Sequence, residues 1–113
     1  MSDLPDALPP ERVAELHEAG AIELVDIREP HEREAGHVPG SRHIELAKLS
    51  QEAGSIARDK PLVLYCRMGS RSSMALDAFK ASGYDAHHME GGLEAWAEKG
   101  LPLDPEDGSV AGH

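Results

Sequence analysis

Short apolar runs alternate along the chain with segments whose apolar residues recur at helical spacing. The runs are rich in branched residues and end in polar or charged ones, which predicts buried strands. The periodic segments are bounded by glycine and proline, which predicts short helices. The expected strands cover 21–27, 61–65 and 84–89, and the expected helices cover 8–20, 44–53, 72–82 and 93–99. Alternating strands and helices indicate an α/β fold, with a parallel sheet covered by helices on both faces.

The chain length sets the domain organisation. With 113 residues the chain can build one hydrophobic core but not two. We expect a single domain over residues 1–103 and a flexible C-terminal tail over residues 104–113, which are mostly small or polar. The segment from Glu29 to Gly40 holds two prolines, two glycines and little periodicity, so a long loop is expected there.

Charge and composition narrow the classes of partner. The formal net charge of −10 argues against nucleic acid and anionic membranes, because both are negatively charged themselves. No stretch approaches the roughly eighteen consecutive apolar residues of a membrane span, and the first residues lack the pattern of a signal peptide. These features predict a cytoplasmic location. The single cysteine, Cys66, excludes an internal disulfide and a metal site built from several cysteines.

Candidate functional residues lie where the expected strands end. In a parallel α/β sheet, binding sites form beyond the carboxyl ends of the strands. Asp26 and Arg28 end the first expected strand, and Cys66 directly follows the second. The helix after Cys66 is expected to take Ser72 or Ser73 as its N-cap. Cys66 is either a small buried hydrophobic residue or a reactive thiol.

The segment from Cys66 to Arg71 has the features of an anion-binding loop. Cysteine reacts as its thiolate, which requires surroundings that stabilise negative charge. The loop is short and contains Gly69, so backbone N–H groups can converge on the sulfur, and the following helix adds the positive end of its dipole. Arg67 and Arg71 carry planar, multi-donor groups suited to a small oxyanion. We therefore interpret Cys66 as a nucleophile.

Four motifs occur along the chain in this order: Leu24-Val25-Asp26-Ile27-Arg28, Gly36-His37-Val38-Pro39-Gly40-Ser41, Cys66-Arg67-Met68-Gly69-Ser70-Arg71 and Glu90-Gly91-Gly92-Leu93-Glu94-Ala95-Trp96. Together they resemble the rhodanese family, specifically its single-domain sulfurtransferases, and the resemblance covers about residues 8 to 103. The resemblance implies a three-layer fold whose mostly parallel central sheet has about five strands. It also implies a Cys66 persulfide that takes sulfane sulfur from thiosulfate or a related persulfide and gives it to cyanide or a thiol. No metal or organic cofactor is implied.

The resemblance also distributes roles among the site residues. Cys66 is expected to be catalytic, and the substrate-binding residues are Arg67, Met68, Gly69, Ser70 and Arg71. Asp26, Arg28 and Ser72 are expected to support the site. Paired strand-end charges commonly brace a fold, so bracing is favoured for Arg28 over contact with an anionic substrate.

Loop size separates sulfur chemistry from the phosphatases and arsenate reductases, which are relatives that also carry a cysteine on an anion-binding loop. A phosphatase loop would place its arginine at position 72, which is Ser72 here, one residue after Arg71. A tighter ring of N–H groups suits a single sulfur atom better than a tetrahedral phosphoryl group. The sequence therefore favours sulfur transfer.

Three further features have mainly structural interpretations. His37 sits in a Gly-His-Val-Pro-Gly turn, which favours a structural hydrogen bond over a role as base for Cys66. His87 and His88 are neighbours on an expected strand and point to opposite faces, so we assign them no catalytic role and no shared metal. Met68 is either an apolar lip for an acceptor or a neutral filler.

Two functions follow from these features. The first is an enzyme that uses a small anionic sulfur donor and a thiophilic acceptor. The second is a persulfide carrier or protein-interaction module that receives persulfide from a partner protein and has little turnover of small molecules. A sulfur-accepting protein is a further candidate partner. The sequence does not separate these two functions.

Overall fold

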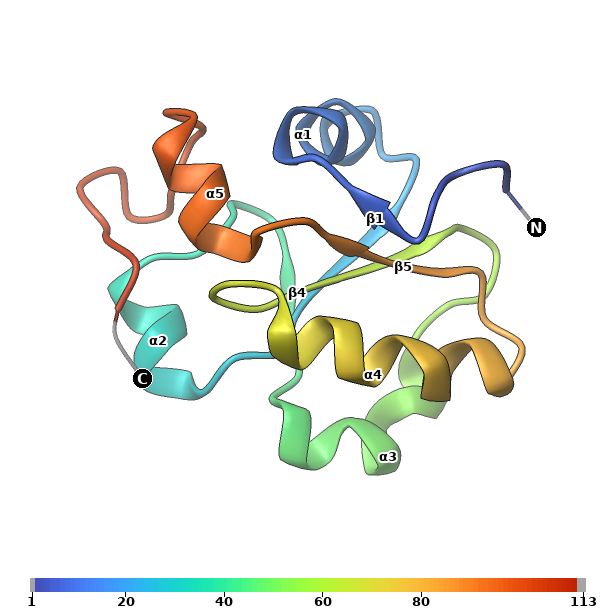
Figure 1. Cartoon of the computed structure of the whole chain (residues 1–113). Helices are drawn as coiled ribbons and strands as arrows, with labels where there is room; N and C mark the ends of the chain where they lie inside the picture. Colours follow the sequence, from blue (N-terminus) through green and yellow to red (C-terminus); the bar gives the residue numbers. More distant parts are fainter. Residues whose placement is uncertain (1, 112–113) are drawn as a thin grey trace.

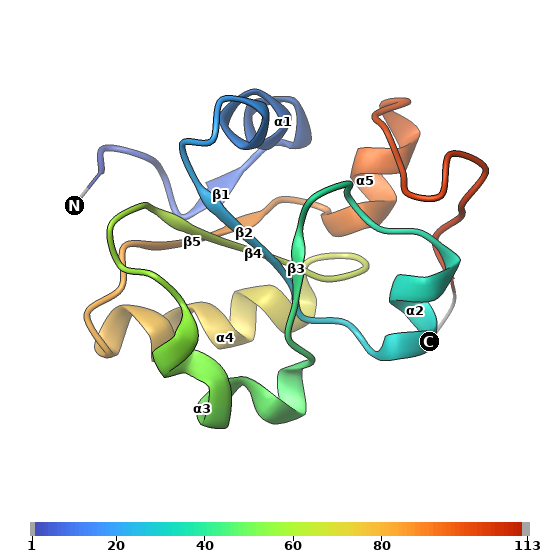
Figure 2. The same cartoon turned by 180° about the vertical axis from the view of Figure 1, so that it is seen from behind.

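The computed structural model describes residues 2–111, which form a parallel sheet with helices on both faces (Figures 1 and 2). The strands are β1 (Ala7–Leu8), β2 (Glu23–Asp26), β3 (Arg42–His43), β4 (Leu62–Tyr65) and β5 (Ala86–Met89). The α-helices are α1 (Pro10–Glu18), α2 (Pro30–Ala35), α3 (Leu49–Glu52), α4 (Ser70–Ala81) and α5 (Gly92–Glu98). Two 3-10 turns, η1 (Leu46–Lys48) and η2 (Ala53–Ser55), flank α3. The fold class expected from the sequence is confirmed, including the five parallel strands.

The sheet has the strand order β1-β5-β4-β2-β3, so β4 lies in its centre. Every residue of β4 is buried, because α3 and α4 cover one face and α1 and α5 cover the other (Figure 1). The register pairs Asp26 of β2 with Tyr65 of β4. The carboxyl ends of these two strands are therefore level, and the residues that follow them emerge at the same edge of the sheet.

Alternation along β4 divides the core into two clusters. Leu62 and Leu64 pack with Phe79 of α4, whereas Val63 and Tyr65 pack with Trp96 of α5. Cys66 continues the alternation and joins the α4 cluster. The strand thus delivers its cysteine to the side of the sheet where α4 begins.

Two strands were missed by the sequence pattern. β1 and β3 are two residues long each, and such short segments show no alternation that periodicity can detect. β1 pairs with β5, and β3 pairs with β2, so these two strands are defined by their pairing in the sheet.

The prediction of a long loop from Glu29 to Gly40 is wrong over its first half, because Pro30–Ala35 form α2. Pro30 supplies the φ angle of a first helical residue, and Glu29 and Glu32 form a reciprocal capping box. Six residues are too few to show an apolar period. Local capping chemistry therefore forms a helix here that hydrophobic patterning does not reveal.

Two further helix expectations need correction. The helix expected over 44–53 is a succession of η1, α3 and η2. The helix after Cys66 begins at Ser70 and takes Gly69, with φ of 104°, as its N-cap, so neither Ser72 nor Ser73 is the cap. The earlier start brings Arg71 and Ser72 into the first turn of α4.

Residues 104–111 of the expected tail lie along α2 and the turn after it. Asp104 and His37 form an antiparallel bridge, and the Ser109 backbone N–H donates to the Ala35 carbonyl at 2.8 Å. Residues 112 and 113 lie outside the described residues, and the flexibility of the tail stays a prediction. None of the described helices has the length and apolar character needed to cross a membrane.

Candidate active site

Cys66 lies at the end of β4, at the start of a loop that extends from the sheet toward α2 (Figures 1 and 2). Its side chain is fully buried. The sulfur accepts the backbone N–H of Gly69 at 3.1 Å and that of Ser72 at 3.5 Å. These N–H groups and the positive end of the twelve-residue α4 face the same atom, and both stabilise negative charge on it.

Glycine is required at position 69 by its backbone conformation. The φ angle of 104° lies in a region that side chains disfavour, and it turns the Gly69 N–H toward the sulfur. A Cβ there would meet the nearest atom, the Gly91 nitrogen, at an ordinary 3.5 Å. Conformation, and not crowding, therefore explains this glycine.

Ser72 links the sulfur to His88, a residue for which the sequence predicts no catalytic role. The Ser72 hydroxyl is buried and lies 3.6 Å from the Cys66 sulfur, 3.2 Å from the Gly69 carbonyl oxygen and 3.2 Å from Nδ1 of His88. Burial lowers the pKa of His88, against the opposing effects of Asp6 and Glu90, and so favours its neutral form. Strand alternation could have indicated that His88 faces α4. His88 pairs with Leu64, whose side chain packs on the α4 face.

Arg71 is held by a carboxylate. Its two terminal nitrogens donate to the two oxygens of Glu32 at 2.8 and 2.9 Å, and Glu32 is fully buried. These hydrogen bonds to Glu32 raise the pKa of Arg71 above its ordinary value. Glu32 also accepts the Glu29 backbone N–H at 3.1 Å. The capping box of α2 therefore orients the arginine of the cysteine loop.

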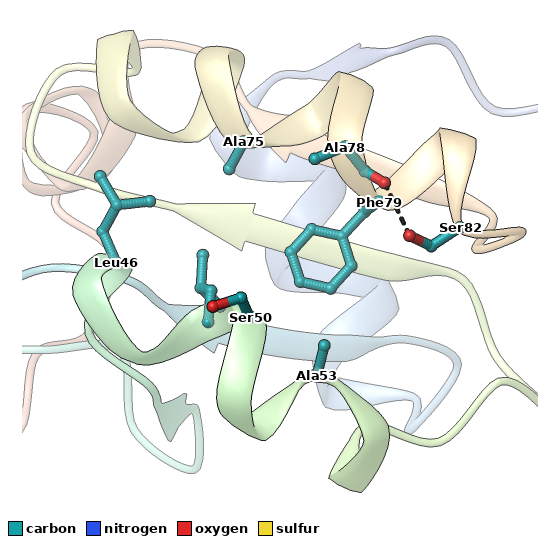
Figure 3. A pocket seen from close by; sticks show the side chains of 8 residues that line it. Leu46, Ser50, Ala53, Ala75, Ala78, Phe79 and Ser82 are labelled. Atoms are coloured by element: carbon teal, nitrogen blue, oxygen red, sulfur yellow. Dashed lines mark hydrogen bonds between the residues drawn. The ribbon is translucent and has the colours of Figure 1, made fainter.

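A pocket of about 510 Å³ opens beside this ion pair. It is lined by Ile27, Glu29, Glu45, Leu46, Ala47 and Arg71. An apolar groove of about 400 Å³ lies between α3 and α4, where Figure 3 shows Leu46, Ala75 and Phe79 on its walls. Leu46 lines both concavities, so the apolar groove adjoins the pocket that contains Arg71.

Arg67 also has an acidic neighbour. Its Nε lies 3.3 Å from a carboxylate oxygen of Glu94, which belongs to the first turn of α5. The remaining expected substrate-binding residues differ in exposure: Met68 is 53% exposed, Ser70 is exposed and Gly69 is buried. The loop therefore presents Met68 and Ser70 to solvent, while both arginines contact glutamates.

The glycine pair before α5 packs directly on the cysteine loop. Leu93 and Glu94 donate their backbone N–H groups to the carbonyl oxygens of Cys66 and Arg67, at 2.8 and 2.9 Å. A Cβ on Gly92 would lie 2.5 Å from those same oxygens. The turn into α5 is thus a structural support of the loop and requires a residue without a side chain.

Asp26 and Arg28 form a fully buried ion pair at the end of β2. Arg28 donates from Nε and Nη2 to the two Asp26 oxygens at 2.9 and 2.8 Å, and Nη2 also donates to the Gly36 carbonyl. Burial alone would lower the pKa of Arg28, but the hydrogen bonds to Asp26 raise it overall. Tyr65 adds its hydroxyl to Asp26 at 3.2 Å. This network connects the ends of β2 and β4 to the turn after α2. The role of Asp26 and Arg28 in supporting the site stays a prediction.

His37 takes part in a structural contact. Its Nδ1 lies 3.0 Å from the Arg33 carbonyl oxygen, and its Nε2 lies 3.6 Å from a carboxylate oxygen of Asp104. The ring thus joins α2 to the segment that follows α5.

One group of potential metal ligands occurs among residues 2–111, namely Glu29, His31 and Glu32, with ligand atoms within 4.8 Å of one another. Both Glu32 oxygens bond to Arg71. The positive guanidinium beside this group opposes a cation there.

Comparisons with known proteins identify the family to which the chain belongs. The family model of the rhodanese-like domain matches residues 9–99. The thiosulfate sulfurtransferase GlpE of Pseudomonas aeruginosa is 37% identical over 111 residues, which cover 97% of this chain and 99% of GlpE. An HTH-type transcriptional regulator of Mycobacterium tuberculosis is 34% identical over 111 residues, 96% of this chain, which spans about half of the regulator, 48% of its length.

Solved structures show the same fold. A rhodanese-related protein from Thermoplasma volcanium superposes with a TM-score of 0.82 at 27% identity, covering 88% of this chain and 97% of that protein. The family match extends from α1 to the end of α5 and includes both the cysteine loop and the Asp26–Arg28 ion pair. The chain belongs to the rhodanese-like domain family.

Proposed function

We propose that this protein is a sulfurtransferase that moves sulfane sulfur from thiosulfate or a related persulfide donor to cyanide or a thiol, through a persulfide on Cys66. The observation that carries the proposal is the buried Cys66 sulfur, held by two backbone N–H groups at the start of α4. Such a cradle stabilises a thiolate, and it equally suits the terminal sulfur of a persulfide. The GlpE enzymes, named as thiosulfate sulfurtransferases, support this assignment.

In the first half-reaction the Cys66 thiolate attacks the outer sulfur of the donor. A sulfur–sulfur bond forms to Cys66 as the donor's own sulfur–sulfur bond breaks. With thiosulfate the leaving group is sulfite, which takes the electron pair of the broken bond. The N–H groups of Gly69 and Ser72 then face the negative charge of the new persulfide.

In the second half-reaction the acceptor attacks the terminal sulfur of the persulfide. Cyanide is converted to thiocyanate and a thiolate acceptor to a new persulfide. In both cases the sulfur–sulfur bond to Cys66 breaks and Cys66 regains its thiolate. The positive end of α4 faces the sulfur in each state, so the same cradle serves both half-reactions. Phosphate chemistry is disfavoured, because the six-residue loop places Ser72 where a phosphatase loop has its arginine.

The contacts of Arg67 and Arg71 with glutamates favour a second candidate function, a persulfide carrier that receives sulfur from a protein or thiol partner. Arg71 is bonded to Glu32 and Arg67 lies against Glu94, so much of their charge is already balanced. Glu29 and Glu45 also line the pocket beside Arg71. A small dianion is therefore attracted weakly, whereas exposed Met68 and Met74 offer apolar contact to a partner surface.

Mass spectrometry of the intact protein tests sulfur loading. Incubation with thiosulfate or glutathione persulfide should add the mass of one sulfur atom, and cyanide should remove it. Cys66→Ser is the matched control and should gain nothing. A wild-type protein that acquires no cyanide-removable sulfur from thiosulfate, glutathione persulfide or a persulfidated protein would overturn the proposal.

Donor rates separate the two candidates. Fast turnover with thiosulfate and cyanide supports the enzyme. Slow turnover with free donors, together with rapid loading from a persulfidated protein, supports the carrier. Both measurements use the same Cys66 persulfide as readout, so the comparison is internal to one protein.

A further inference from the structure

Ser72 and His88 form a hydrogen-bonded chain that ends on the Cys66 sulfur. The Ser72 hydroxyl is 3.6 Å from the sulfur and 3.2 Å from Nδ1 of His88. Ser72 lies in the first turn of α4 and His88 lies on β5, so helix and strand position the two groups independently. Cys66 and Ser72 are fully buried, whereas His88 is partly exposed. The chain thus extends from a buried sulfur to a ring that reaches solvent.

The number of available protons restricts which of these hydrogen bonds can form at the same time. Ser72 has one hydroxyl proton and three neighbours, namely the Cys66 sulfur, the Gly69 carbonyl and His88 Nδ1. When Cys66 is a thiol, its S–H donates to Ser72, whose own proton is then directed to the Gly69 carbonyl or to His88. When Cys66 is a thiolate, the sulfur needs donors, and the Ser72 hydroxyl can provide one only if it turns toward the sulfur.

We propose that His88 is a positioning residue that turns the Ser72 hydroxyl toward the Cys66 thiolate, by donating its Nδ1–H to the Ser72 oxygen. When Cys66 ionises, the three hydrogen-bonded side chains together release one proton to water. The former S–H proton remains on Ser72 and is donated to the thiolate, the Ser72 proton passes to His88 Nδ1, and Nε2 of His88 releases a proton. The thiolate is left with three donors, the N–H groups of Gly69 and Ser72 and the Ser72 hydroxyl.

The surroundings of His88 agree with a neutral ring that changes tautomer. Burial lowers the pKa of His88, while the acidic groups that face it, Asp6 before β1 and Glu90 after β5, oppose this effect. Asp6 is itself paired with Lys80 of α4, which reduces its influence. The proposal rests on Cys66 reacting as a thiolate, which the proposed function also requires, but it does not depend on any sulfur donor.

The test is the pH dependence of Cys66 alkylation by iodoacetamide in the intact protein, followed by mass spectrometry. Because the sulfur is buried, the absolute rate also reflects access, whereas the pH at half-maximal rate reflects ionisation. Ser72→Ala and His88→Phe should each move this midpoint upward by about one unit, the effect of losing one hydrogen bond to a charged group. At pH values well below both midpoints the rate should fall about tenfold.

Conservative variants distinguish positioning from general disruption. Ser72→Thr keeps the hydroxyl, and His88→Asn places an amide N–H near the position of Nδ1, so both should recover most of the midpoint shift. His87→Asn is the matched control, because His87 points to the other face and contacts Pro5 and Asp85. Thermal unfolding shows whether each variant is folded at the temperature of the assay.

The outcomes are distinct. The proposal is supported if the midpoint rises in Ser72→Ala and His88→Phe but stays close to the wild-type value in Ser72→Thr and His88→Asn. An unchanged midpoint in either Ser72→Ala or His88→Phe overturns it, as does a shift of equal size in His87→Asn. Because alkylation uses no sulfur donor, these results are separate from a failure of sulfur transfer.

Discussion

Glu32 and Arg71, which lie 39 residues apart in the chain, are joined by two parallel hydrogen bonds of 2.8 and 2.9 Å. This pair ties the first turn of α2 to the first turn of α4, next to the cysteine loop. A buried carboxylate therefore determines the direction in which the Arg71 guanidinium points. The binding of an anionic donor by Arg71 stays a prediction.

Glu32→Gln tests this tie. The variant keeps one acceptor oxygen but loses the negative charge that balances Arg71, so we expect the free energy of unfolding to fall by about 3 kcal/mol. Urea denaturation measures this loss. Glu34→Gln removes the same charge from an exposed position of α2 and should leave stability nearly unchanged. Equal effects of the two variants would contradict a special role for the Glu32–Arg71 pair.

Glu94→Gln tests whether Arg67 is restrained by its acidic neighbour. Removing the carboxylate 3.3 Å from Nε should leave Arg67 a more effective attractor of thiosulfate, and we expect sulfur loading to accelerate about threefold at low salt. The gain should disappear at high ionic strength. Glu98→Gln removes the same charge from an exposed position of α5 and is the control. A loading rate that is unchanged in Glu94→Gln, or raised equally in both variants, would show that this ion pair does not limit donor capture.

Gly92→Ala should disturb the cysteine loop from outside it. The added Cβ would lie 2.5 Å from the carbonyl oxygens of Cys66 and Arg67, at a φ of 59°. We expect a loss of about 2–4 kcal/mol in the free energy of unfolding and a decrease in sulfur loading at Cys66. Gly54→Ala adds a methyl group where nothing lies within 4 Å, and it should have little effect on either measurement. A stable, fully active Gly92→Ala would contradict the support assigned to this turn.

Tyr65 makes stability sensitive to alkaline pH. Burial, with a further contribution from Asp26, raises the pKa of Tyr65 from 10.0 to about 12. Since the folded protein holds this proton more tightly than the unfolded chain, the associated stability is complete below pH 10 and is lost as pH rises to about 12. Chemical denaturation across this window should therefore show decreasing stability.

Tyr65→Phe should remove that part of the alkaline decrease. At neutral pH the variant should lose about 1–3 kcal/mol, because the hydroxyl accepts the Val38 N–H and contacts Asp26 and Ser41. A variant that loses the same stability as wild type between pH 10 and about 12 would assign the decrease to another group.

Local patterns predicted the parts of the fold that are long or chemically distinctive. β2 and β4 are contained in buried runs of branched residues, and α4 and α5 lie within or close to their expected ranges. β1 and β3 are too short for periodicity and exist because longer strands pair with them. α2 was predicted as loop, although its capping residues, Glu29 and Glu32, were readable in the sequence.

The sequence by itself determined the cysteine loop, since Cys66, Gly69 and the start of α4 lie within a few residues and their geometry is set by local backbone conformation. Only the tertiary structure decided which groups meet that loop. Glu32 reaches Arg71, and His88 reaches Ser72, because the order and register of the parallel strands bring distant segments to one edge of the sheet. Hydrophobic periodicity records which face of an element is buried and carries no information about which elements become neighbours, so these partners became visible only in the folded chain.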